Sequence, residues 1–255
     1  MKIAQIAPLI ESCPPQLYGG TERIVSYLTE ELVRQGHDVT LFASGDSRTS
    51  ARLEASSEKA LRLDPEVSDP TPYHMVMLDN VRARADEFDV LHFHVDVLHY
   101  PVIHDFMDRT VTTMHGRLDL QELQHIHSVF AAAPLVAISN DQRQSLTSAN
   151  WVGTVHHGLP HDLLPFNPVP NGDYLAFLGR IAPEKGPDRA VEIATRAGAR
   201  LKMAAKIDDE DQTYWETVIE PLVAAHPNVE FVGEVNEREK GDFLGNAKAL
   251  LFPID

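Results

Sequence analysis

Residues 174–197 read YLAFLGRIAPEKGPDRAVEIATRA, and this stretch contains the pattern that decides the fold. It begins with an apolar run, residues 174–178, which has the length and composition of a buried strand. Gly179-Arg180 ends the run, Lys185-Gly186 follows, and residues 186–197 have the spacing of an amphipathic helix. A strand, a glycine-bearing loop and a helix in this order predict one unit of a parallel α/β sheet.

The two cations of this loop predict an anion site. Arg180 offers a planar fork of donors and Lys185 a point charge, and together they can hold a diphosphate at the end of a strand. The first turn of the following helix adds backbone N–H groups and the positive end of a dipole. Two ordinary surface cations in a loop are the alternative interpretation of these residues.

The same alternation of apolar runs and helical segments extends over the chain. Thr21 begins the clearest helical segment, residues 21–35, in which Ile24, Leu28, Leu32 and Val33 form one stripe and Gly36 occupies the C-cap position. A further helix is predicted at residues 213–225. The other predicted strands cover residues 3–8, 38–43, 90–94, 110–115, 135–139, 152–156, 201–206, 229–232 and 249–253. The fold class is therefore α/β, with doubly wound parallel sheets of the Rossmann-like kind.

A cluster of prolines predicts the boundary between two domains. Pro160, Pro165, Pro168 and Pro170 crowd the region around residues 161–173, as is typical of a linker. We expect an N-terminal Rossmann-like domain at residues 1–165 and a C-terminal one at residues 166–255.

Composition excludes several classes of partner. A net charge of −16 without a dense run of Lys and Arg argues against nucleic acid and anionic membranes. No apolar stretch is long enough to span a membrane. The single cysteine, Cys13, cannot form an internal disulfide and fits a reducing compartment, so we expect a cytoplasmic protein. Cys13 itself is interpreted as an incidental small residue.

A second glycine-bearing loop precedes the helix that begins at Thr21. Its end, Gly19-Gly20-Thr21-Glu22, allows a ligand to approach the backbone closely, and either Gly20 or Thr21 is expected to cap the helix. The loop lacks the Gly-x-Gly-x-x-Gly fingerprint of dinucleotide binding. A plain tight turn is the alternative.

Histidines gather at the predicted ends of strands. His92 and His94 alternate and therefore share one face, His115 closes the next strand, and His156 and His157 precede Gly158. Because ligands bind beyond the carboxyl ends of parallel strands, these side chains are expected at a binding edge. Ordinary hydrogen-bonded structural roles are the alternative. A metal site is disfavoured, because it needs two or three ligands that converge with a carboxylate. His92 with His94 and His125 with His127 are the candidate pairs, but the second pair falls in a predicted helix, where residues i and i+2 do not share a face.

These motifs together resemble the retaining glycosyltransferases of family 4, which have the GT-B fold of two Rossmann-like domains. The matching motifs, in chain order, are Gly19-Gly20-Thr21-Glu22, residues 89–94, Thr113-Met114-His115-Gly116, Ile138-Ser139, His157-Gly158-Leu159, Gly179-Arg180 with Lys185-Gly186, Phe231-Val232-Gly233 and residues 250–254. The segment at His157 departs from the family pattern, which has Asn-Gly-(Val/Ile)-Asp in that place.

The resemblance implies an activity and a set of site residues. A sugar would pass from a nucleotide-diphosphate donor to an acceptor hydroxyl with retention of configuration, in the cleft between an acceptor-side first domain and a donor-side second domain. The resemblance implies no metal and no cofactor, because cations of the protein neutralise the leaving diphosphate. The implied catalytic residues are His115, Arg180 and Lys185. The implied donor and phosphate residues are Gly19, Gly20, Gly179, Arg180 and Lys185, and the implied residues of the acceptor or sugar pocket are His94, Thr21 and Gly158.

One departure limits the expected activity. The family carries a Glu-x(7)-Glu segment after the strand that corresponds to residues 249–254, and this sequence stops at Asp255. We therefore expect an incomplete second domain, impaired turnover, and an exposed sheet edge that favours self-association. A non-catalytic binding module and a nucleotide-sugar epimerase on the same fold are the alternatives; the epimerase needs a pair of acid/base carboxylates, which the sequence does not reveal.

Overall fold

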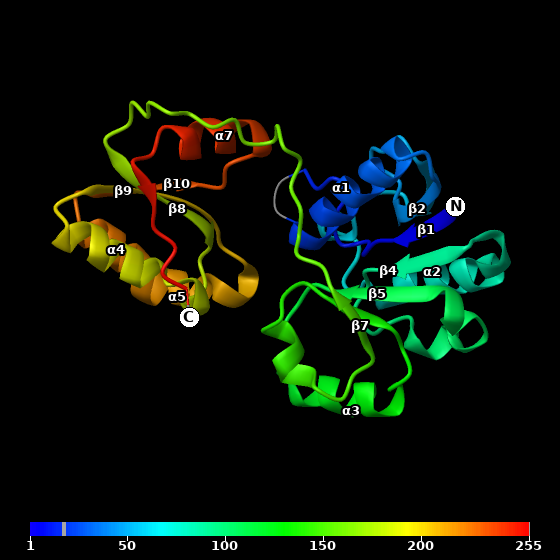
Figure 1. Cartoon of the computed structure of the whole chain (residues 1–255). Coiled ribbons are helices and arrows are strands. Elements are labelled where there is room, and N and C mark those ends of the chain that lie inside the picture. Colours follow the sequence, from blue (N-terminus) through cyan, green and yellow to red (C-terminus); the bar gives the residue numbers. More distant parts are fainter. Residues whose placement is uncertain (17–18, 255) are drawn as a thin grey trace. The chain divides into compact units, whose positions relative to one another are not determined.

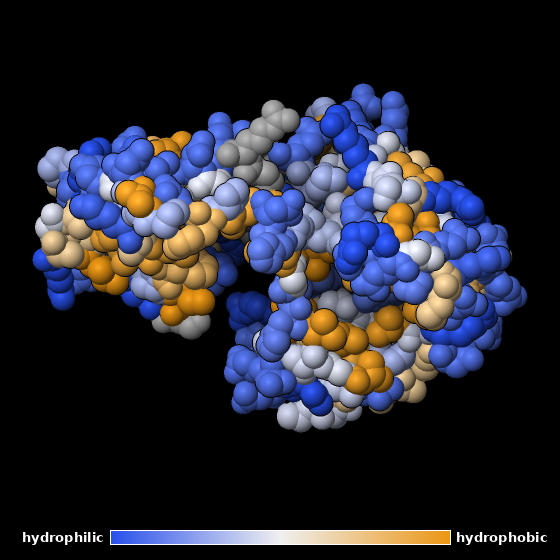
Figure 2. All heavy atoms as spheres, turned by 45° about the horizontal axis from the view of Figure 1, so that its top comes forward, coloured by the Kyte–Doolittle hydropathy of each residue, from blue (hydrophilic) through white to orange (hydrophobic). Residues whose placement is uncertain are grey.

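The computed structural model describes residues 1–16 and 19–254 and divides into two compact units, Met1–Leu159 and Pro160–Asp255 (Figure 1). The division follows Leu159, whereas the proline cluster had suggested residue 165. Hydrophilic side chains cover much of the face shown in Figure 2, with apolar patches between them, in keeping with the acidic composition. In the described residues, no helix has both the length and the apolar character needed to cross a bilayer.

The first unit is built on a parallel sheet. In the described part of this unit the sheet has seven strands in the order β3-β2-β1-β4-β5-β6-β7. The order reverses beside β1, so the connections diverge on either side of it and leave room at the carboxyl ends of β1 and β4. The strands are β1 Lys2–Ile6, β2 Asp38–Ser44, β3 Arg52–Ser57, β4 Val90–Phe93, β5 Thr110–Met114, β6 Leu135–Ala137 and β7 Trp151–Thr154.

Helices cover both faces of this sheet. The three α-helices among the described residues of this unit are α1 Gly20–Arg34, α2 Thr71–Ala83 and α3 Gln121–Val129. Side chains on the two faces alternate along the strands: Ala4, Ile6 and Phe42 join the core that contains α2, whereas Ala7 and Leu41 pack with Val25 of α1. Short 3-10 turns complete the connections at Leu61–Leu63, Ala85–Glu87, Tyr100–Val102, His104–Arg109 and Gln142–Leu146.

Helix α1 packs with a different face from the predicted one. Its fully buried residues are Glu22, Val25, Ser26 and Thr29, and the predicted apolar stripe is only half-buried. The sheet surface at this point combines the small residues Ala7 and Ala43 with Leu41, so small side chains of the helix can pack closely against it. The C-cap of α1 is Gln35, and Gly36 follows it with a φ of 85°, the left-handed conformation expected of the glycine that ends a helix.

The second unit repeats the design on a smaller parallel sheet. In its described part the strand order is β10-β9-β8-β11, and the order reverses beside β8. The strands are β8 Tyr174–Arg180, β9 Arg200–Lys206, β10 Val229–Gly233 and β11 Ala249–Leu250. The helical segments are α4 Pro187–Arg196, α5 Gln212–Tyr214, a π-helical turn Trp215–Ile219, α6 Glu220–Ala225 and α7 Glu237–Gly245. Phe177, Val191 and Met203 lie at the centre of its core.

Several elements differ from the sequence predictions. The edge strand β3 was not predicted because its residues are mostly polar or small, and neither α2 nor α7 was predicted. The single helix expected at residues 213–225 is interrupted by a π turn just before Pro221, which has no N–H to donate to the preceding turn. Strand β11 is shorter than expected, since pairing ends after the Leu251 N–H donates to the carbonyl of Ala176 (2.7 Å), two residues before Pro253.

We predict that Gly186→Ala destabilises the second unit more than Gly198→Ala. Both glycines have positive φ, 63° and 61°, so both substitutions strain the backbone by about 1–2 kcal/mol. Only at Gly186 would the new Cβ also overlap the carbonyl oxygen of Pro253, whereas Gly198 has open space around it. We expect a loss of about 3 kcal/mol or more for Gly186→Ala in urea unfolding. Equal losses for the two variants would contradict the crowded contact.

Candidate functional site

Two of the predicted site histidines contact one another at the carboxyl ends of neighbouring strands. His94 follows β4, His115 follows β5, and Nδ1 of His94 lies 2.8 Å from Nε2 of His115. Nδ1 of His115 lies in turn 3.1 Å from Nε2 of His157, which comes after β7. The three imidazoles therefore form a hydrogen-bonded row that begins in the core and ends at an exposed histidine.

The row continues into the middle of the sheet through a glutamine. Nε2 of His94 lies 2.8 Å from Oε1 of Gln5, which is fully buried on β1. Nε2 of Gln5 lies 3.4 Å from Nδ1 of His92, and Nε2 of His92 lies 2.7 Å from Oγ1 of Thr113. The alternation along β4 places His92 and His94 on one face, with ring centroids 4.1 Å apart. We call this set the histidine relay: Thr113, His92, Gln5, His94, His115 and His157.

Burial keeps the histidine relay uncharged near neutral pH. Desolvation lowers the pKa of His92 to about 4 and that of His115 to about 3, and the pKa of His115 is lowered further by His157 and His92. Burial is also the main cause that holds the pKa of His94 well below its usual range, with its neighbouring histidines adding to the effect. At neutral pH each ring thus has one donor and one acceptor nitrogen, which is suited to ordering hydroxyl groups.

The ring nitrogens of His92 and His94 are occupied by hydrogen bonds within the relay. His127 is buried and bonds Tyr100 instead, at 3.2 Å between Oη and Nδ1. Over the whole described part of the chain, no three His, Cys, Asp or Glu side chains are arranged to hold a metal ion.

The two glycines in the glycine loop of the first unit, Gly19 and Gly20, differ in how closely other residues pack against them. Gly19 is the N-cap of α1 and has no side-chain cap, so the expected caps, Gly20 and Thr21, are wrong, since both residues already lie within the helix. A Cβ at Gly19 would lie 2.7 Å from Cβ of Pro15, whereas Gly20 has open space around it. Gly158, in the loop after β7, is likewise exposed and open. The backbone at Gly20 and Gly158 is therefore accessible, while Gly19 is required by close packing.

Two buried carboxyl groups support this loop. Glu11 forms an ion pair with Arg62, and its backbone N–H donates to Oε1 of Glu22 (3.3 Å) in the first turn of α1. Burial is the main cause that raises the pKa of Glu22. The sequence indicated Glu22 as a first-turn acid but gave no sign that it is buried.

In the second unit, carboxylates surround the guanidinium of Arg180, the last residue of β8. Its Nη2 lies 2.8 Å from Oε1 of Glu184, its Nη1 lies 3.0 Å from Oε1 of Glu210, and its Nε lies 3.2 Å from Oδ2 of Asp211. Asp208 lies at 3.7 Å from Nη1. Asp208, Glu210 and Asp211 thus pair with Arg180 instead of forming only a solvated acidic turn. We call Glu184, Asp208, Glu210 and Asp211 the carboxylate ring.

The other residues of this motif lie around the start of α4. Lys185 ends the 3-10 turn Pro183–Lys185, and its Nζ lies 6.0 Å from the ring centroid of Phe252. Gly186 is the N-cap of α4, with its backbone against the carbonyl of Pro253. Gly179, one residue before Arg180, has only ordinary contacts at its Cβ position. The predicted cations thus lie at the carboxyl end of a strand and before a helix, as the motif indicated.

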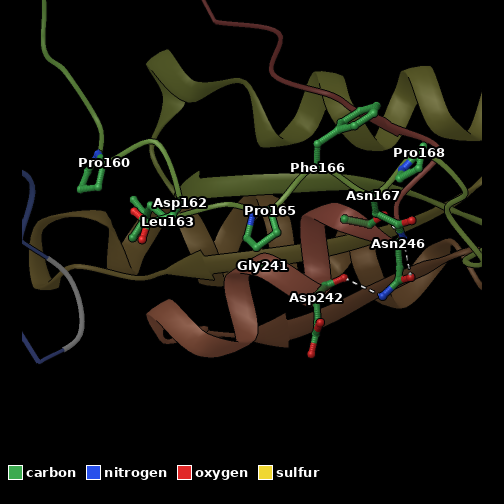
Figure 3. A pocket seen from close by; sticks show the side chains of 11 residues that line it. Pro160, Asp162, Leu163, Pro165, Phe166, Asn167, Pro168, Gly241, Asp242 and Asn246 are labelled. Carbon is green, nitrogen blue, oxygen red and sulfur yellow. Dashed lines mark hydrogen bonds between the residues drawn. The ribbon is translucent and has the colours of Figure 1, made fainter.

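A groove of about 780 Å³ in the second unit lies elsewhere and has a different chemistry. It is formed by residues 160–168 and α7, and Figure 3 shows Asn167 and Asn246 pointing toward one another, with Phe166 directed away from Asp242. The Asn167 amide donates to the carbonyl of Gly245 (2.9 Å). The lining contains two aspartates and no cation, so this groove does not suit a phosphate ligand.

Sequence reasoning missed two members of the histidine relay, Gln5 and Thr113, and it missed the carboxylate ring. Gln5 was detectable, because a glutamine inside the apolar run of a central parallel strand needs a buried partner. Thr113 could be found from the alternation along β5. The partners of Arg180 could not, because Glu184 and Glu210 reach it from two loops whose conformations the sequence pattern does not determine.

Comparisons with known proteins show the family and the fold of the chain. A family model described as Glycosyltransferase Family 4 matches residues 18–183. AviGT4, a glycosyltransferase involved in avilamycin A biosynthesis, has a similar structure, with a TM-score of 0.69 and 20% identity over 98% of this chain and 68% of that one. A comparison with curated proteins found no significant match.

Two further solved structures share the fold. Sucrose-phosphate synthase from Thermosynechococcus elongatus has a TM-score of 0.74 at 16% identity and covers 99% of this chain and 75% of its own. Anabaena HepE, solved in complex with UDP and glucose, has a TM-score of 0.68 at 14% identity and covers 100% and 74%. At these identities the likenesses show the fold alone, and they confirm the predicted GT-B class with its two parallel-sheet domains.

We predict that His92 makes the fold less stable in mild acid. The unfolded chain binds a proton on His92 below about pH 6.5, whereas the folded chain resists it until about pH 4, so stability falls as the pH is lowered. Between pH 7 and pH 5 this histidine should account for about 2 kcal/mol of lost unfolding free energy. In urea unfolding, the free energy of unfolding of His92→Gln should therefore fall by about 2 kcal/mol less than that of wild type over the same pH range.

His125→Gln provides the matched control, because His125 is an exposed histidine on α3. Its unfolding free energy should keep the wild-type dependence on pH. The same dependence in His92→Gln as in wild type would show that burial does not hold His92 neutral.

Proposed function

Because the chain belongs to glycosyltransferase family 4, we propose that it transfers a sugar from a nucleotide-diphosphate donor to an acceptor hydroxyl with retention of configuration. The observation that carries the donor side of this proposal is the position of Arg180 and Lys185. Both cations lie where the second sheet reverses its strand order, between the end of β8 and the start of α4. That is the place where parallel sheets bind phosphorylated ligands.

The donor diphosphate exchanges with part of the carboxylate ring in this proposal. Glu210 and Glu184, the partners of Arg180 with the most exposed side chains, are 71% and 49% exposed. They can turn into solvent when phosphate oxygens take their places on the guanidinium fork. Asp211 is buried and remains as the group that orients Arg180.

The first unit supplies the sugar and acceptor side. His115 and His94 order sugar hydroxyls through the uncharged relay, and Thr21 and Gly158 border the same carboxyl edge of the sheet. The open backbone at Gly20 lets a ligand approach the start of α1, which Gly19 caps. These roles match the positions that the family motifs assign to the same residues.

Catalysis follows from charge neutralisation rather than from a covalent intermediate. Arg180 and Lys185 stabilise the negative charge that grows on the leaving diphosphate, and we propose that no metal is required for this step. The six residues of the histidine relay include no carboxylate that could act as a nucleophile. The leaving phosphate then accepts the proton of the acceptor hydroxyl.

An activity assay can distinguish the proposed transfer from two other functions. A binding module would bind a nucleotide sugar without releasing nucleoside diphosphate. An epimerase on this fold would change the sugar without an acceptor, and it would need paired acid/base carboxylates, for which the relay offers none. Product analysis with and without an acceptor separates the three.

We predict that Arg180→Ala weakens the binding of UDP about 10- to 100-fold, since charge-assisted hydrogen bonds contribute about 1.5–3 kcal/mol. Isothermal titration calorimetry measures the affinity directly. Arg196→Ala is the matched control, because Arg196 is an exposed arginine of the same unit that pairs with Glu192 on α4. An unchanged affinity in Arg180→Ala would remove Arg180 from the donor site.

We predict that Glu210→Gln strengthens the binding of UDP about two- to fivefold. The substitution removes one negative charge from the ring around Arg180 but keeps the shape, and an exposed ion pair of this kind contributes up to about 1 kcal/mol. Glu220→Gln, at the exposed start of α6, is the control with the same change in net charge. Equal gains in both variants would mean that only the overall charge matters.

A further inference from the structure

The side-chain amide of Gln5 joins the two branches of the histidine relay and gives them a direction. Its Oε1 can only accept a hydrogen bond and its Nε2 can only donate one. Oε1 faces Nε2 of His94 and Nε2 faces Nδ1 of His92. Every neutral imidazole has one protonated nitrogen. The orientation of the Gln5 amide therefore fixes which nitrogen of the adjacent histidine is protonated, and that histidine fixes the tautomer of the next one.

The longer branch ends at a free acceptor atom. Since Oε1 of Gln5 accepts, His94 is protonated on Nε2, and its Nδ1 accepts from Nε2–H of His115. Nδ1 of His115 then accepts from Nε2–H of His157. Nδ1 of His157 is therefore unprotonated, and within residues 1–16 and 19–254 no hydrogen bond to it is found.

The shorter branch fixes the remaining tautomer. Nε2 of Gln5 donates to Nδ1 of His92, and Nε2–H of His92 donates to Oγ1 of Thr113. All four histidines of the relay are thus protonated on Nε2. The burial of Gln5 and His94 keeps water from breaking the row between its two ends.

The arrangement changes the role of His115. Both of its ring nitrogens are already bonded, one to His94 and the other to His157, so neither is available to a ligand. His157 is exposed and is the only relay histidine with an open ring nitrogen among the described residues. A ligand hydroxyl that reaches the row meets His157 first.

We propose that Gln5 is a positioning residue that sets the direction of the relay, so that His157 presents an unprotonated Nδ1 as acceptor for a sugar hydroxyl. The ligand part of this inference rests on the proposed function, whereas the direction of the relay does not. His115 acts through His157 in this arrangement. The hydroxyl can belong to the donor sugar or to the acceptor, because both carry the same chemistry.

The direction is tested by nuclear magnetic resonance of the whole chain labelled with ¹⁵N-histidine at pH 7.5. We expect the proton on Nε2 of His92, His94, His115 and His157. His156 and His74 serve as references in the same spectrum, because their Nδ1 atoms donate to the carbonyls of Ile138 (3.0 Å) and Pro70 (2.9 Å). A proton on Nδ1 of any of the four relay histidines would overturn the proposal.

The role of Gln5 is tested by Gln5→Met, which removes donor and acceptor together. We expect His157 to lose its single tautomer and to gain a detectable population protonated on Nδ1, although its ring is separated from Gln5 by two other histidines. Thr112→Val is the matched control, since it removes a buried partner of His99 (2.7 Å) on the opposite face. An unchanged His157 spectrum in folded Gln5→Met overturns the positioning role, and if that variant does not fold, the wild-type spectrum still decides the direction.

The ligand part is tested by comparing UDP-glucose with UDP by calorimetry. His157→Ala should lower the affinity for UDP-glucose about tenfold and that for UDP less than twofold, because a single hydrogen bond contributes up to about 1.5 kcal/mol. His156→Ala should change both affinities equally. Equal losses of the two ligands in His157→Ala overturn the hydroxyl contact. If neither ligand binds the wild type, the proposed function fails, and the tautomer spectrum decides the relay independently.

Discussion

The order of the strands in each sheet reverses beside the first strand of that sheet, and the rest of the site depends on this constraint. The chain leaves β1 toward β2 and β3 and returns to the other side at β4, and it leaves β8 toward β9 and β10 before it returns at β11. The connections on the two sides diverge, so they cannot cover the carboxyl ends of β1, β4 and β8. The glycine loop follows β1, His94 follows β4 and Arg180 ends β8, so all three lie at these uncovered ends.

The two units differ in the charge of the polar groups that they place near these strand ends. In the first unit, burial keeps the histidines uncharged, and His92, His94 and His115 each donate one hydrogen bond and accept another. In the second unit, full charges of both signs lie within hydrogen-bonding distance around Arg180. Neutral hydrogen bonds discriminate the geometry of hydroxyl groups, whereas a guanidinium discriminates charge and planarity.

Much of the fold could be predicted from the sequence because the central strands are nearly continuous apolar runs. Strands β1, β2, β5 and β9 lie close to the predicted ranges, since burial on both faces favours apolar and β-branched residues along them, with Gln5 of β1 as a buried polar exception. The edge strand β3 is half polar and pairs on one side only, so its signal is weak. The face of α1 was predicted wrongly because the size of the residues beneath a helix, which the helix sequence does not contain, decides which of its faces is buried.

The site could be predicted only as a set of residue types at strand ends. Position along a strand gave the shared face of His92 and His94, and chain order gave Arg180 before a helix. Which atoms bond one another depends on registers between strands and on loops, and these bring Gln5 between two histidines and Glu210 onto Arg180. Such pairings join residues far apart in the chain, so local periodicity carries no information about them.

The ring of acids around Arg180 also has a consequence for selectivity. Its guanidinium already holds several carboxylates, so an incoming anion must exchange with them instead of meeting a bare cation. A monovalent anion such as chloride replaces one carboxylate of the ring by another single negative charge, so its binding to Arg180 gains little free energy. A chelating anion with several oxygens on one body displaces two partners while losing the freedom of only one molecule. The carboxylate ring should therefore make Arg180 selective for anions with several oxygens over simple monovalent anions.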